Sequence, residues 1–419
     1  LGDILVTAEE ASFNFDLAAF YSHFLNLIRL AQKEDGSLPD FVPPYNPRVY
    51  PADPAWGSAY ISLCWHLYYF YGDQDILRKH FQNLKNYVEF LRKKATGQIL
   101  YGLGKYGDWC QPGSLVAKKT PLELVSTWFY YHDLWLFSKI CEALGRQNEA
   151  REYQELAQQI KGAFNGAFLD GDQYRALRQG PMDCLPDQTA NILPLYLNMV
   201  PEEKKGAVLH NLLESIIIHH DYHLDTGVIG TRFLLDVLSQ YGFQDVALRI
   251  ILQDSYPGWG YMIKEGATTL WERWEKLTGR GMNSHNHIMF GSVDAWLYKN
   301  LAGLEPLEPG WKTFQVKPYA GINSLNCRLM TIPGPIEINW QKSDYRFQLD
   351  LQIPVNTRAK IFFPTIWPSF TIKESNLLIW EENEFLAPEE VSNISLTELN
   401  HLPVFWVESG QYSFVMEKI

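Results

Sequence analysis

The chain has 419 residues, of which 46% are hydrophobic and 14% aromatic, and its formal net charge is −12 at pH 7. The apolar content excludes a disordered chain, and the length exceeds one ordinary core, so we expect a large domain and a smaller one. The acidic balance argues against a nucleic-acid partner, and no apolar run is long enough to span a bilayer.

The chain opens with LGDILVTAEEASF, which has no initiator Met and none of the regions of a signal peptide. We expect it to be a fragment cut within an element. The five cysteines are Cys64, Cys110, Cys141, Cys184 and Cys327. They include no Cys-x-x-Cys pair, so neither a structural zinc site nor a dense disulfide framework is indicated. We expect reduced, buried thiols in a cytoplasmic protein.

From Ala8 to about Leu304 the hydrophobic pattern is helical, with two kinds of helix. Helices apolar on nearly all sides are predicted at 55–72, 126–137, 187–200 and 230–242. Charged helices with one apolar stripe are predicted at 73–94, 148–164, 202–220 and 243–254. A helix apolar all round must be surrounded, whereas a striped helix lies outside. The alternation predicts a repeat, either an open solenoid or a closed (α/α)6 toroid, and the aromatic inner helices favour the toroid.

After Leu304 the hydrophobic pattern becomes alternating. The alternating runs are 336–340, 347–353 and 359–363. Short alternating runs separated by turn residues predict a small antiparallel β-sandwich. We therefore place the (α/α)6 barrel at residues 1–304 and the C-terminal β-sandwich at residues 305–419, with the boundary between Gly303 and Pro309.

In a helical ring the ligand site belongs in the loops at the open mouth. Four connections carry a Trp or His beside a carboxylate, at 36–57, 100–113, 257–275 and 282–293. Their candidate side chains are Asp53, Trp56, Asp108, Trp109, Trp259, Glu265, Glu272, His285 and His287. Aromatic rings against C–H faces, with acids on hydroxyls, indicate a carbohydrate site.

Each of these residues also has a structural interpretation. A Trp at a helix start commonly packs in the interior, and Asp108 is suited to cap a helix. Glu272 is satisfied structurally if Arg273 or His287 pairs with it.

The run IIIHHDYHLDTG (216–227) spaces histidines as metal ligands on a helix would be spaced. The residues concerned are His219, His220, Asp221, His223 and Asp225. The run is polar and ends in a Gly turn, which favours a solvated connection. We expect no metal site here.

Glycoside hydrolysis with inversion needs a carboxylic acid and a carboxylate base roughly 6.5–9.5 Å apart. Glu265 and Glu272 lie nearly on one face of a helix predicted over 265–277, with Cα atoms about 10 Å apart by helical rise. Both would approach the sugar from one side, so this pair is poorly aimed for inversion.

Four motifs together resemble bacterial α-L-rhamnosidases of glycoside hydrolase family 78, over essentially the whole chain. They are DPAWGSA (53–59), YGDW (106–109), YPGWGYMIKEGATTLWERW (256–274) and MNSHNHIMFGSV (282–293). The resemblance implies an (α/α)6 barrel followed by a β-sandwich, and an enzyme without metal or organic cofactor.

By position, the resemblance implies that Glu272 is the general base and that His287 contacts rhamnose. Trp56 and Trp109 would pack against the sugar, and Asp3 would be a rhamnose-binding carboxylate. The family's general acid falls a few residues before Leu1, outside the 419 residues. We therefore expect the chain alone to be inactive.

We expect a truncated α-L-rhamnosidase that hydrolyses terminal α-L-rhamnosides with inversion, acting on a rhamnose-containing oligosaccharide or glycoside. Asp3, Trp56, Trp109, Glu272 and His287 should then converge at one end of the ring. The alternatives are another toroid glycosidase, acting on fucosides or glucosides, and a non-catalytic sugar-binding module. The sequence indicates neither the aglycone nor an oligomeric state.

Overall fold

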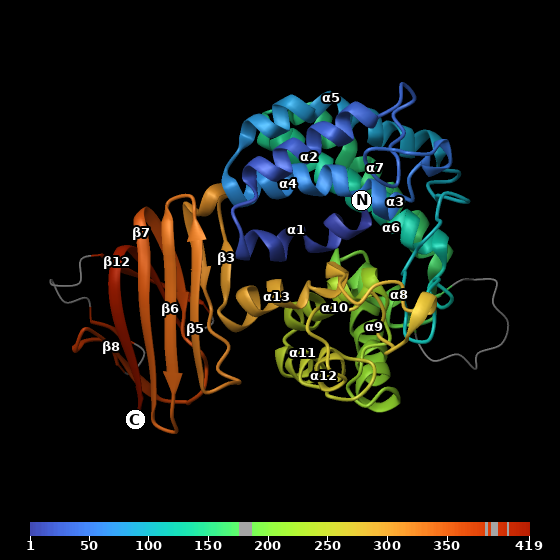
Figure 1. The fold of residues 1–419 in the computed structure, drawn as a ribbon. Coiled ribbons are helices and arrows are strands. Elements are labelled where there is room, and N and C mark those ends of the chain that lie inside the picture. The colour runs from blue at the N-terminus through green and yellow to red at the C-terminus, as the bar shows by residue number, and fades with distance from the viewer. Residues whose placement is uncertain (176–186, 382–383, 387–392, 400–401) are drawn as a thin grey trace. The chain divides into compact units, whose positions relative to one another are not determined.

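The computed structural model describes residues 1–175, 187–381, 384–386, 393–399 and 402–419 (Figure 1). These residues pack into two units. The first comprises Leu1–Glu10, Leu17–His66 and Gln74–Val293, and the second Ala11–Asp16, Leu67–Asp73 and Asp294–Ile419. The second unit also includes the mostly helical residues 11–16 and 67–73, so it is not one continuous stretch of chain. The domain boundary between residues 303 and 309 remains a prediction.

The elements have the following bounds. The helices are α1 (Gly2–Asn14), α2 (Ala18–Ala31), α3 (Pro54–Gly57), α4 (Ala59–Tyr71), α5 (Gln74–Lys94), α6 (Leu122–Ala143), α7 (Gln147–Phe168), α8 (Gln188–Tyr196), α9 (Glu202–Glu214), α10 (Val228–Gln240), α11 (Gln244–Ile251), α12 (Trp259–Lys264) and α13 (Val293–Trp296). Short 3-10 or π turns are η1 (Pro47–Val49), η2 (Ser215–His219), η3 (Gly279–Gly281), η4 (Ile288–Phe290), η5 (Leu297–Leu301) and η6 (Pro309–Trp311). The strands are β1 (Leu169–Asp170), β2 (Gln173–Tyr174), β3 (Leu304–Pro306), β4 (Thr313–Val316), β5 (Ser324–Thr331), β6 (Gly334–Lys342), β7 (Arg346–Phe362), β8 (Phe370–Glu374), β9 (Leu377–Glu381), β10 (Glu384–Phe385), β11 (Ile394–Leu399) and β12 (Leu402–Lys418).

The two predicted kinds of helix are present in the first unit. The middle of α6, from Leu124 to Ser138, is buried on nearly every side, whereas α5 buries one stripe that includes Leu77, Leu84 and Leu91. The enclosed helices α6, α8 and α10 pack on one another in turn, and each is followed by a partner, α7, α9 or α11. The predicted alternation of inner and outer helices is therefore confirmed for these pairs. Closure into a toroid remains a prediction.

The helical prediction is wrong for residues 265–277. Helix α12 ends at Lys264, and Gly266 adopts a left-handed backbone conformation with φ of 91°. The β-branched residues Thr268 and Thr269 follow, and they are poor helix formers because their χ1 freedom is restricted. The backbone of 270–275 is therefore irregular. The arrangement of Glu265 and Glu272 on one helical face does not exist.

None of the helices in the described part of the chain has the length and apolar content needed to cross a membrane. Of the predicted reduced thiols, Cys64, Cys110 and Cys141 are free and buried, and Cys327 is free and half-buried. Cys184 lies outside the described residues.

The second unit is built on a branched sheet (Figure 1). The predicted alternation is confirmed in β6, where Ile336, Ile338 and Trp340 are buried. The long strand β7 contains the predicted run 347–353 and all but the last residue of 359–363, and it pairs with β12 over most of its length. The prediction of purely antiparallel pairing is wrong at one place, because β4 pairs parallel with β7. A parallel pair needs a long crossover connection, and the β5–β6 hairpin lies within it. A two-layer sandwich remains a prediction.

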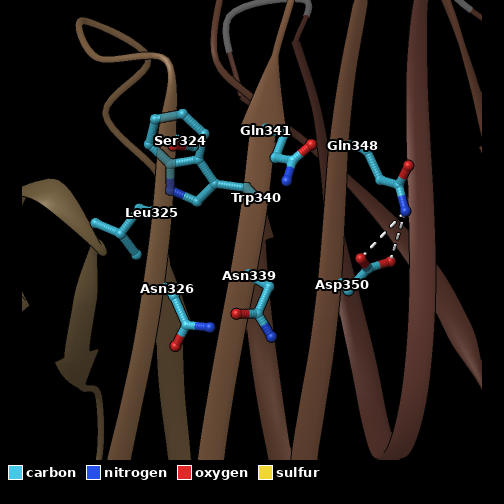
Figure 2. Close-up of a pocket in the computed structure, with 8 residues that line it drawn as sticks. All are labelled: Ser324, Leu325, Asn326, Asn339, Trp340, Gln341, Gln348 and Asp350. Carbon is cyan, nitrogen blue, oxygen red and sulfur yellow. Dashed lines mark hydrogen bonds between the residues drawn. The ribbon is translucent and has the colours of Figure 1, made fainter.

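The outward face of β5, β6 and β7 is polar (Figure 2). Asn326, Asn339 and Asp350 are aligned across the three strands by the pairing register. Gln348 donates to both Asp350 oxygens at 3.1 Å. These residues line a shallow depression of about 270 Å³. Trp340 belongs to the core, since it is only 1% exposed, so the depression offers no aromatic platform from that ring.

Candidate active site

Glu272 lies on a segment whose backbone is fixed by a second segment. The Glu272 N–H donates to the Ser284 carbonyl at 3.0 Å, and the His287 N–H donates to the Leu270 carbonyl at 2.8 Å. Residues 270–272 and 284–287 therefore run side by side. This pairing places Glu272 and His287 on one local unit.

The Glu272 carboxylate is half-buried and keeps most of its capacity to accept hydrogen bonds. Asn283 Nδ2 donates to Glu272 Oε1 at 3.2 Å. Among the described residues, this is the side-chain donor to the Glu272 carboxylate. The two predicted structural partners are otherwise engaged: Arg273 pairs with Glu275 at 3.0 Å, and His287 faces Asp3. Glu272 is therefore not neutralised by a fixed cation among the described residues.

The aromatic residues around Glu272 anchor its segment. Trp271 and Trp274 are 4% and 0% exposed. Trp274 donates to the Thr226 carbonyl at 3.0 Å and stacks on Phe290 with ring centroids 4.1 Å apart. Trp259 is also buried, and its indole donates to the Phe290 carbonyl at 2.9 Å. This placement favours the structural interpretation of Trp259 over a role as a sugar platform.

Asp3, in α1, and His287 face each other. His287 Nε2 lies 3.7 Å from Asp3 Oδ1. His287 Nδ1 accepts the N–H of Met289 at 3.4 Å, so a neutral imidazole carries its proton on Nε2, on the side of Asp3. The Asp3 side chain is 60% exposed. The pair thus presents a donor and a carboxylate at an open surface.

Trp56 and Trp109 are joined by a third ring. A Cβ added at Gly2 would overlap the Trp56 indole, so this ring lies directly on the backbone beside Asp3. The Trp56 and Tyr106 rings are 4.6 Å apart, and Tyr106 meets Trp109 edge-on at 5.5 Å. The three rings form one aromatic wall.

The aromatic wall comes close to Glu272 at Cys110, the residue after Trp109. Burial raises the pKa of the Cys110 thiol, and the neighbouring Glu272 carboxylate raises it further. Glu272 and Cys110 are therefore close enough to interact electrostatically. The structure thus brings together Asp3, Trp56, Trp109, Glu272 and His287.

Two buried aspartates hold the wall in place, and we did not predict a role for Asp40. Asp53 Oδ1 accepts the Ala55 N–H at 2.9 Å, and Oδ2 accepts those of Lys105 and Tyr106 at 2.6 and 2.8 Å. Burial raises the Asp53 pKa, and these N–H donors oppose that effect. Asp40 binds Lys105 Nζ at 2.7 Å. Asp53 therefore ties the Trp56 helix to the Tyr106 loop. Tyr106 is the first residue of the YGDW motif, and this motif could have indicated that Tyr106 belongs to the wall.

Asp108 is a helix cap, although for a helix far along the chain. It is 0% exposed and accepts the N–H groups of Gly227, Ile229 and Gly230 at 2.8, 3.0 and 2.9 Å. Thr189 donates to it at 2.6 Å. These donors satisfy the N-terminus of α10, so the structure favours the structural interpretation of Asp108.

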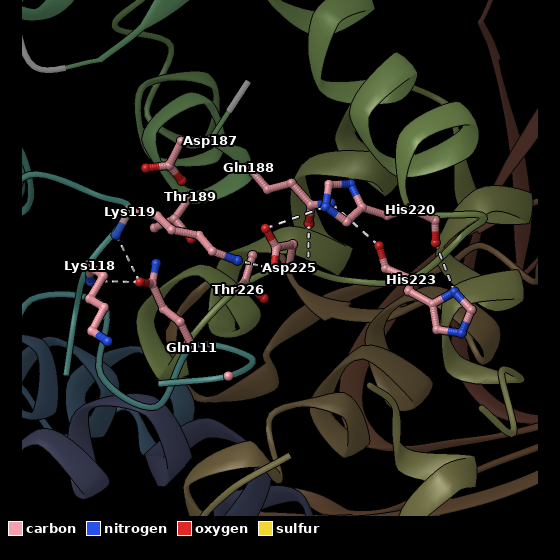
Figure 3. A network of polar contacts seen from close by, with 12 residues as sticks. Gln111, Lys118, Lys119, Asp187, Gln188, Thr189, His220, His223, Asp225 and Thr226 are labelled. Atoms are coloured by element: carbon pink, nitrogen blue, oxygen red, sulfur yellow. Dashed lines mark hydrogen bonds and ion pairs between the residues drawn. The ribbon is translucent and has the colours of Figure 1, made fainter. Parts of the chain in front are cut away.

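A polar network extends from this cap (Figure 3). Gln111 accepts the N–H groups of Lys118 and Lys119 at 3.0 and 3.1 Å. Asp225 pairs with the Lys119 ammonium, and its N–H donates to Gln188 at 2.8 Å. The network joins the loop after Trp109 to the connection before α10.

The histidine-rich run contributes to this network. His220 Nε2 lies 3.4 Å from Asp225, which raises the His220 pKa. His223 Nε2 lies 2.7 Å from Ser255 Oγ. The described residues contain no group of three His, Cys, Asp or Glu side chains arranged to hold a metal ion.

Glu265, the other acid of the predicted pair, is held elsewhere. Its carboxylate pairs with Lys276 Nζ at 2.9 Å, and the same ammonium donates to the Glu265 carbonyl at 2.8 Å. The structure therefore does not bring Glu265 and Glu272 together as a catalytic pair.

Comparison with known proteins identifies the family. Residues 1–301 match the bacterial alpha-L-rhamnosidase 6 hairpin glycosidase domain, and residues 303–371 match the bacterial alpha-L-rhamnosidase C-terminal domain. The chain belongs to the bacterial α-L-rhamnosidase family. The resemblance drawn from the four motifs is confirmed, as is a six-hairpin glycosidase domain followed by a sheet domain.

Individual α-L-rhamnosidases extend the match. One from Streptomyces avermitilis is 32% identical over 375 residues, covering 88% of this chain and 35% of the relative. The solved α-L-rhamnosidase from Dictyoglumus thermophilum is 48% identical with a TM-score of 0.92, covering 100% of this chain and 46% of that one. The Streptomyces avermitilis enzyme complexed with L-rhamnose is 29% identical with a TM-score of 0.85, covering 99% and 38%. The chain thus spans between a third and a half of these α-L-rhamnosidases.

Proposed function

We propose that this chain provides the catalytic barrel and the C-terminal domain of an α-L-rhamnosidase that removes terminal non-reducing α-L-rhamnose with inversion. The observation that carries the proposal is the half-buried Glu272 carboxylate beside the Asp3–His287 pair and the aromatic wall of Trp56 and Trp109. A relative of similar fold is complexed with L-rhamnose, which supports this sugar over a fucoside or a glucoside.

In the proposed mechanism Glu272 accepts a proton from the water that attacks the anomeric carbon. Asn283 steadies one carboxylate oxygen, and the other remains available to the water. Asp3 and His287 bind sugar hydroxyls through a carboxylate and an N–H. Trp56 and Trp109 offer ring surface to the C–H face of the sugar and favour its oxocarbenium-like distortion.

The proposal assigns the proton donor to a residue outside 1–419. The acids nearest to Glu272 in sequence already have cationic partners, since Glu275 pairs with Arg273 and Glu265 pairs with Lys276. A donor is needed to protonate the leaving oxygen. Aryl groups of low pKa need little protonation, so they are the substrates on which residues 1–419 alone would show residual turnover.

The proposal includes the finer architecture. The inner and outer helices of residues 1–304 would close into an (α/α)6 toroid, and residues 305–419 would form a β-sandwich. The packing of α6, α8 and α10 on one another supports the ring, and the branching of the sheet at the long strands β7 and β12 supports the sandwich.

The test is Glu272→Gln in the full-length natural protein with an aryl α-L-rhamnoside. Loss of a catalytic base typically costs about 10²–10⁴-fold in rate, and the melting temperature should stay nearly constant because Gln preserves the shape and the Asn283 contact. Glu265→Gln is the matched control and should keep its rate. ¹H NMR of the first-formed product should show β-L-rhamnose. Near-normal turnover of Glu272→Gln, or a first product of α configuration, would refute the assignment.

A second candidate function is a non-catalytic sugar-binding module. It is favoured only if L-rhamnose binds to the full-length protein and no rhamnoside, fucoside or glucoside is hydrolysed. A panel of the three aryl glycosides separates these outcomes.

A further inference from the structure

Two aromatic rings are stacked at the surface of the Pro-rich connection before α3. The Phe41 and Tyr45 rings are 4.8 Å apart and nearly parallel, with an interplanar angle of 19°. Tyr45 is 81% exposed, and Phe41 is half-buried. Single exposed apolar residues are common. Stacking on Phe41 holds the Tyr45 ring in a fixed orientation and leaves the outer face of that ring in water.

The base of this connection is held firmly. The Asp40 N–H donates to the Val49 carbonyl at 2.9 Å, and the Ala52 N–H donates to the Leu38 carbonyl at 2.7 Å. Asp40 is 2% exposed and accepts the Asp53 N–H at 2.8 Å. Phe41 therefore leaves from a buried, hydrogen-bonded residue, which limits the entropy lost if the pair binds a ligand.

The same anchor connects the pair to the aromatic wall. The Tyr106 hydroxyl lies 3.4 Å from Asp40 Oδ2, and the Tyr106 ring lies between Trp56 and Trp109. Burial raises the pKa of Tyr106 to about 12, and the Tyr45 phenol is among the neighbours that contribute. The stacked pair thus lies next to the wall, on the side of the Tyr106 hydroxyl.

Two polar side chains near the pair already have partners. The Asn46 side chain accepts the Arg48 N–H at 2.8 Å, and Lys105 is paired with Asp40 at 2.7 Å. A second sugar ring would need free amides or acids to bind its hydroxyls, whereas a planar aromatic group needs only ring surface. The surroundings therefore favour an aromatic ligand.

We propose that Phe41 and Tyr45 form the platform for the leaving group, and that this leaving group is a planar aromatic aglycone. This inference rests on the proposed function, since it places rhamnose at the wall and the aglycone on the adjoining rings. Tyr45 would be a specificity-determining residue that strengthens binding of aryl rhamnosides relative to alkyl rhamnosides.

The test measures binding by calorimetry in the full-length natural protein carrying Glu272→Gln, which prevents hydrolysis during titration. The ligands are methyl α-L-rhamnoside, 2-naphthyl α-L-rhamnoside and a rhamnosyl-glucose disaccharide. A stacked aromatic contact is worth about 0.5–1.5 kcal/mol, so the naphthyl rhamnoside should bind about 2- to 12-fold more tightly than the methyl rhamnoside. Tyr45→Ala should remove this advantage, and Tyr45→Phe should keep it.

The matched control is Phe20→Ala in α2. Phe20 is 59% exposed and is stacked on Phe24 at 6.4 Å. Its substitution removes an equivalent exposed ring elsewhere, so the affinities for the methyl and naphthyl rhamnosides should not change. An unchanged naphthyl advantage in Tyr45→Ala overturns the platform and leaves the proposed function standing. A Tyr45-dependent advantage for the disaccharide alone overturns the aromatic ligand in favour of a sugar. Failure of the parent chain to bind methyl α-L-rhamnoside overturns both the platform and the proposed function.

Discussion

Asp108→Asn tests how the wall is held, because it changes one buried oxygen into a donor. Oδ1 accepts the N–H groups of Ile229 and Gly230, and Oδ2 accepts the Gly227 N–H and the Thr189 hydroxyl. Whichever oxygen becomes NH₂ then faces a donor that cannot turn away. The N-terminus of α10 loses part of its cap in either orientation.

The size of the effect follows from these contacts. If the amide nitrogen replaces Oδ1, two buried N–H groups lose their acceptor, and each costs about 1–3 kcal/mol. Loss of the negative charge at a helix N-terminus adds about 0.3–2 kcal/mol. We therefore expect the free energy of unfolding to fall by roughly 2–8 kcal/mol in this orientation. Because Val228 N–H also binds the Trp109 carbonyl at 2.7 Å, affinity for L-rhamnose should fall as well.

Urea unfolding followed by tryptophan fluorescence measures the global loss. Native-state hydrogen exchange of the first turn of α10 locates it, because capped amides should exchange faster once the acceptor is gone. Asp108→Asn with unchanged stability, within about 0.5 kcal/mol, and unchanged exchange in α10 would refute the capping argument.

Three further changes probe the same unit. Gly2→Ala should displace the Trp56 ring, whose atoms occupy the position of the new Cβ, and should weaken L-rhamnose binding in calorimetry with little loss of stability. Gly227→Ala should cost roughly 1–3 kcal/mol in urea unfolding, because its Cβ meets the rigid Trp109 carbonyl. Asp187→Asn should flatten the pH dependence of stability. Burial raises the Asp187 pKa from 3.8 to about 7. The contribution of this carboxyl to the free energy of unfolding is therefore complete below pH 4 and is lost as pH rises through 7. Thermal melts at pH 5 and pH 8 measure the resulting difference in stability.

Each of these three predictions has an outcome that would contradict it. Gly162→Ala, in α7, is the control for both glycine variants, since a Cβ there meets nothing within 4 Å and should leave stability equal or higher by up to about 1 kcal/mol. If Gly2→Ala binds rhamnose normally, the contact between Gly2 and Trp56 does not affect binding. If Gly227→Ala is as stable as Gly162→Ala, the contact between Gly227 and the Trp109 carbonyl does not affect the free energy of unfolding. If Asp187→Asn keeps the pH slope, another group causes it; Asn caps a helix as well as Asp, so loss of the cap does not confuse the result.

The sequence predicted the parts of this fold that depend on local periodicity. The stripe of α5 and the enclosed face of α6 follow from side-chain spacing over a few turns, which a single helix determines. The alternation in β6 and β7 follows in the same way from a period of two. The parallel pairing of β4 with β7 was not predicted, because strand partners are chosen by contacts far apart in the chain.

The candidate site shows the same division between local and distant causes. Glu272 and His287 were recognised from their motifs, whereas the pairing of 270–272 with 284–287 depends on backbone bonds that no periodicity reveals. The expected helix at 265–277 failed for that reason: apolar residues at helical spacing, Trp271 and Trp274, are buried here in an irregular segment. Spacing alone does not distinguish the two cases.

The start of α10 explains why residues so far apart in sequence meet. Asp108 binds its free N–H groups, and the Trp109 carbonyl accepts the Val228 N–H. On the other side, Trp274 donates to the Thr226 carbonyl. One helix terminus therefore receives both the loop with the wall residue Trp109 and the segment with the carboxylate of Glu272. A helix start exposes unpaired N–H groups that must find acceptors, so this need for capping positions two parts of the proposed site with respect to each other.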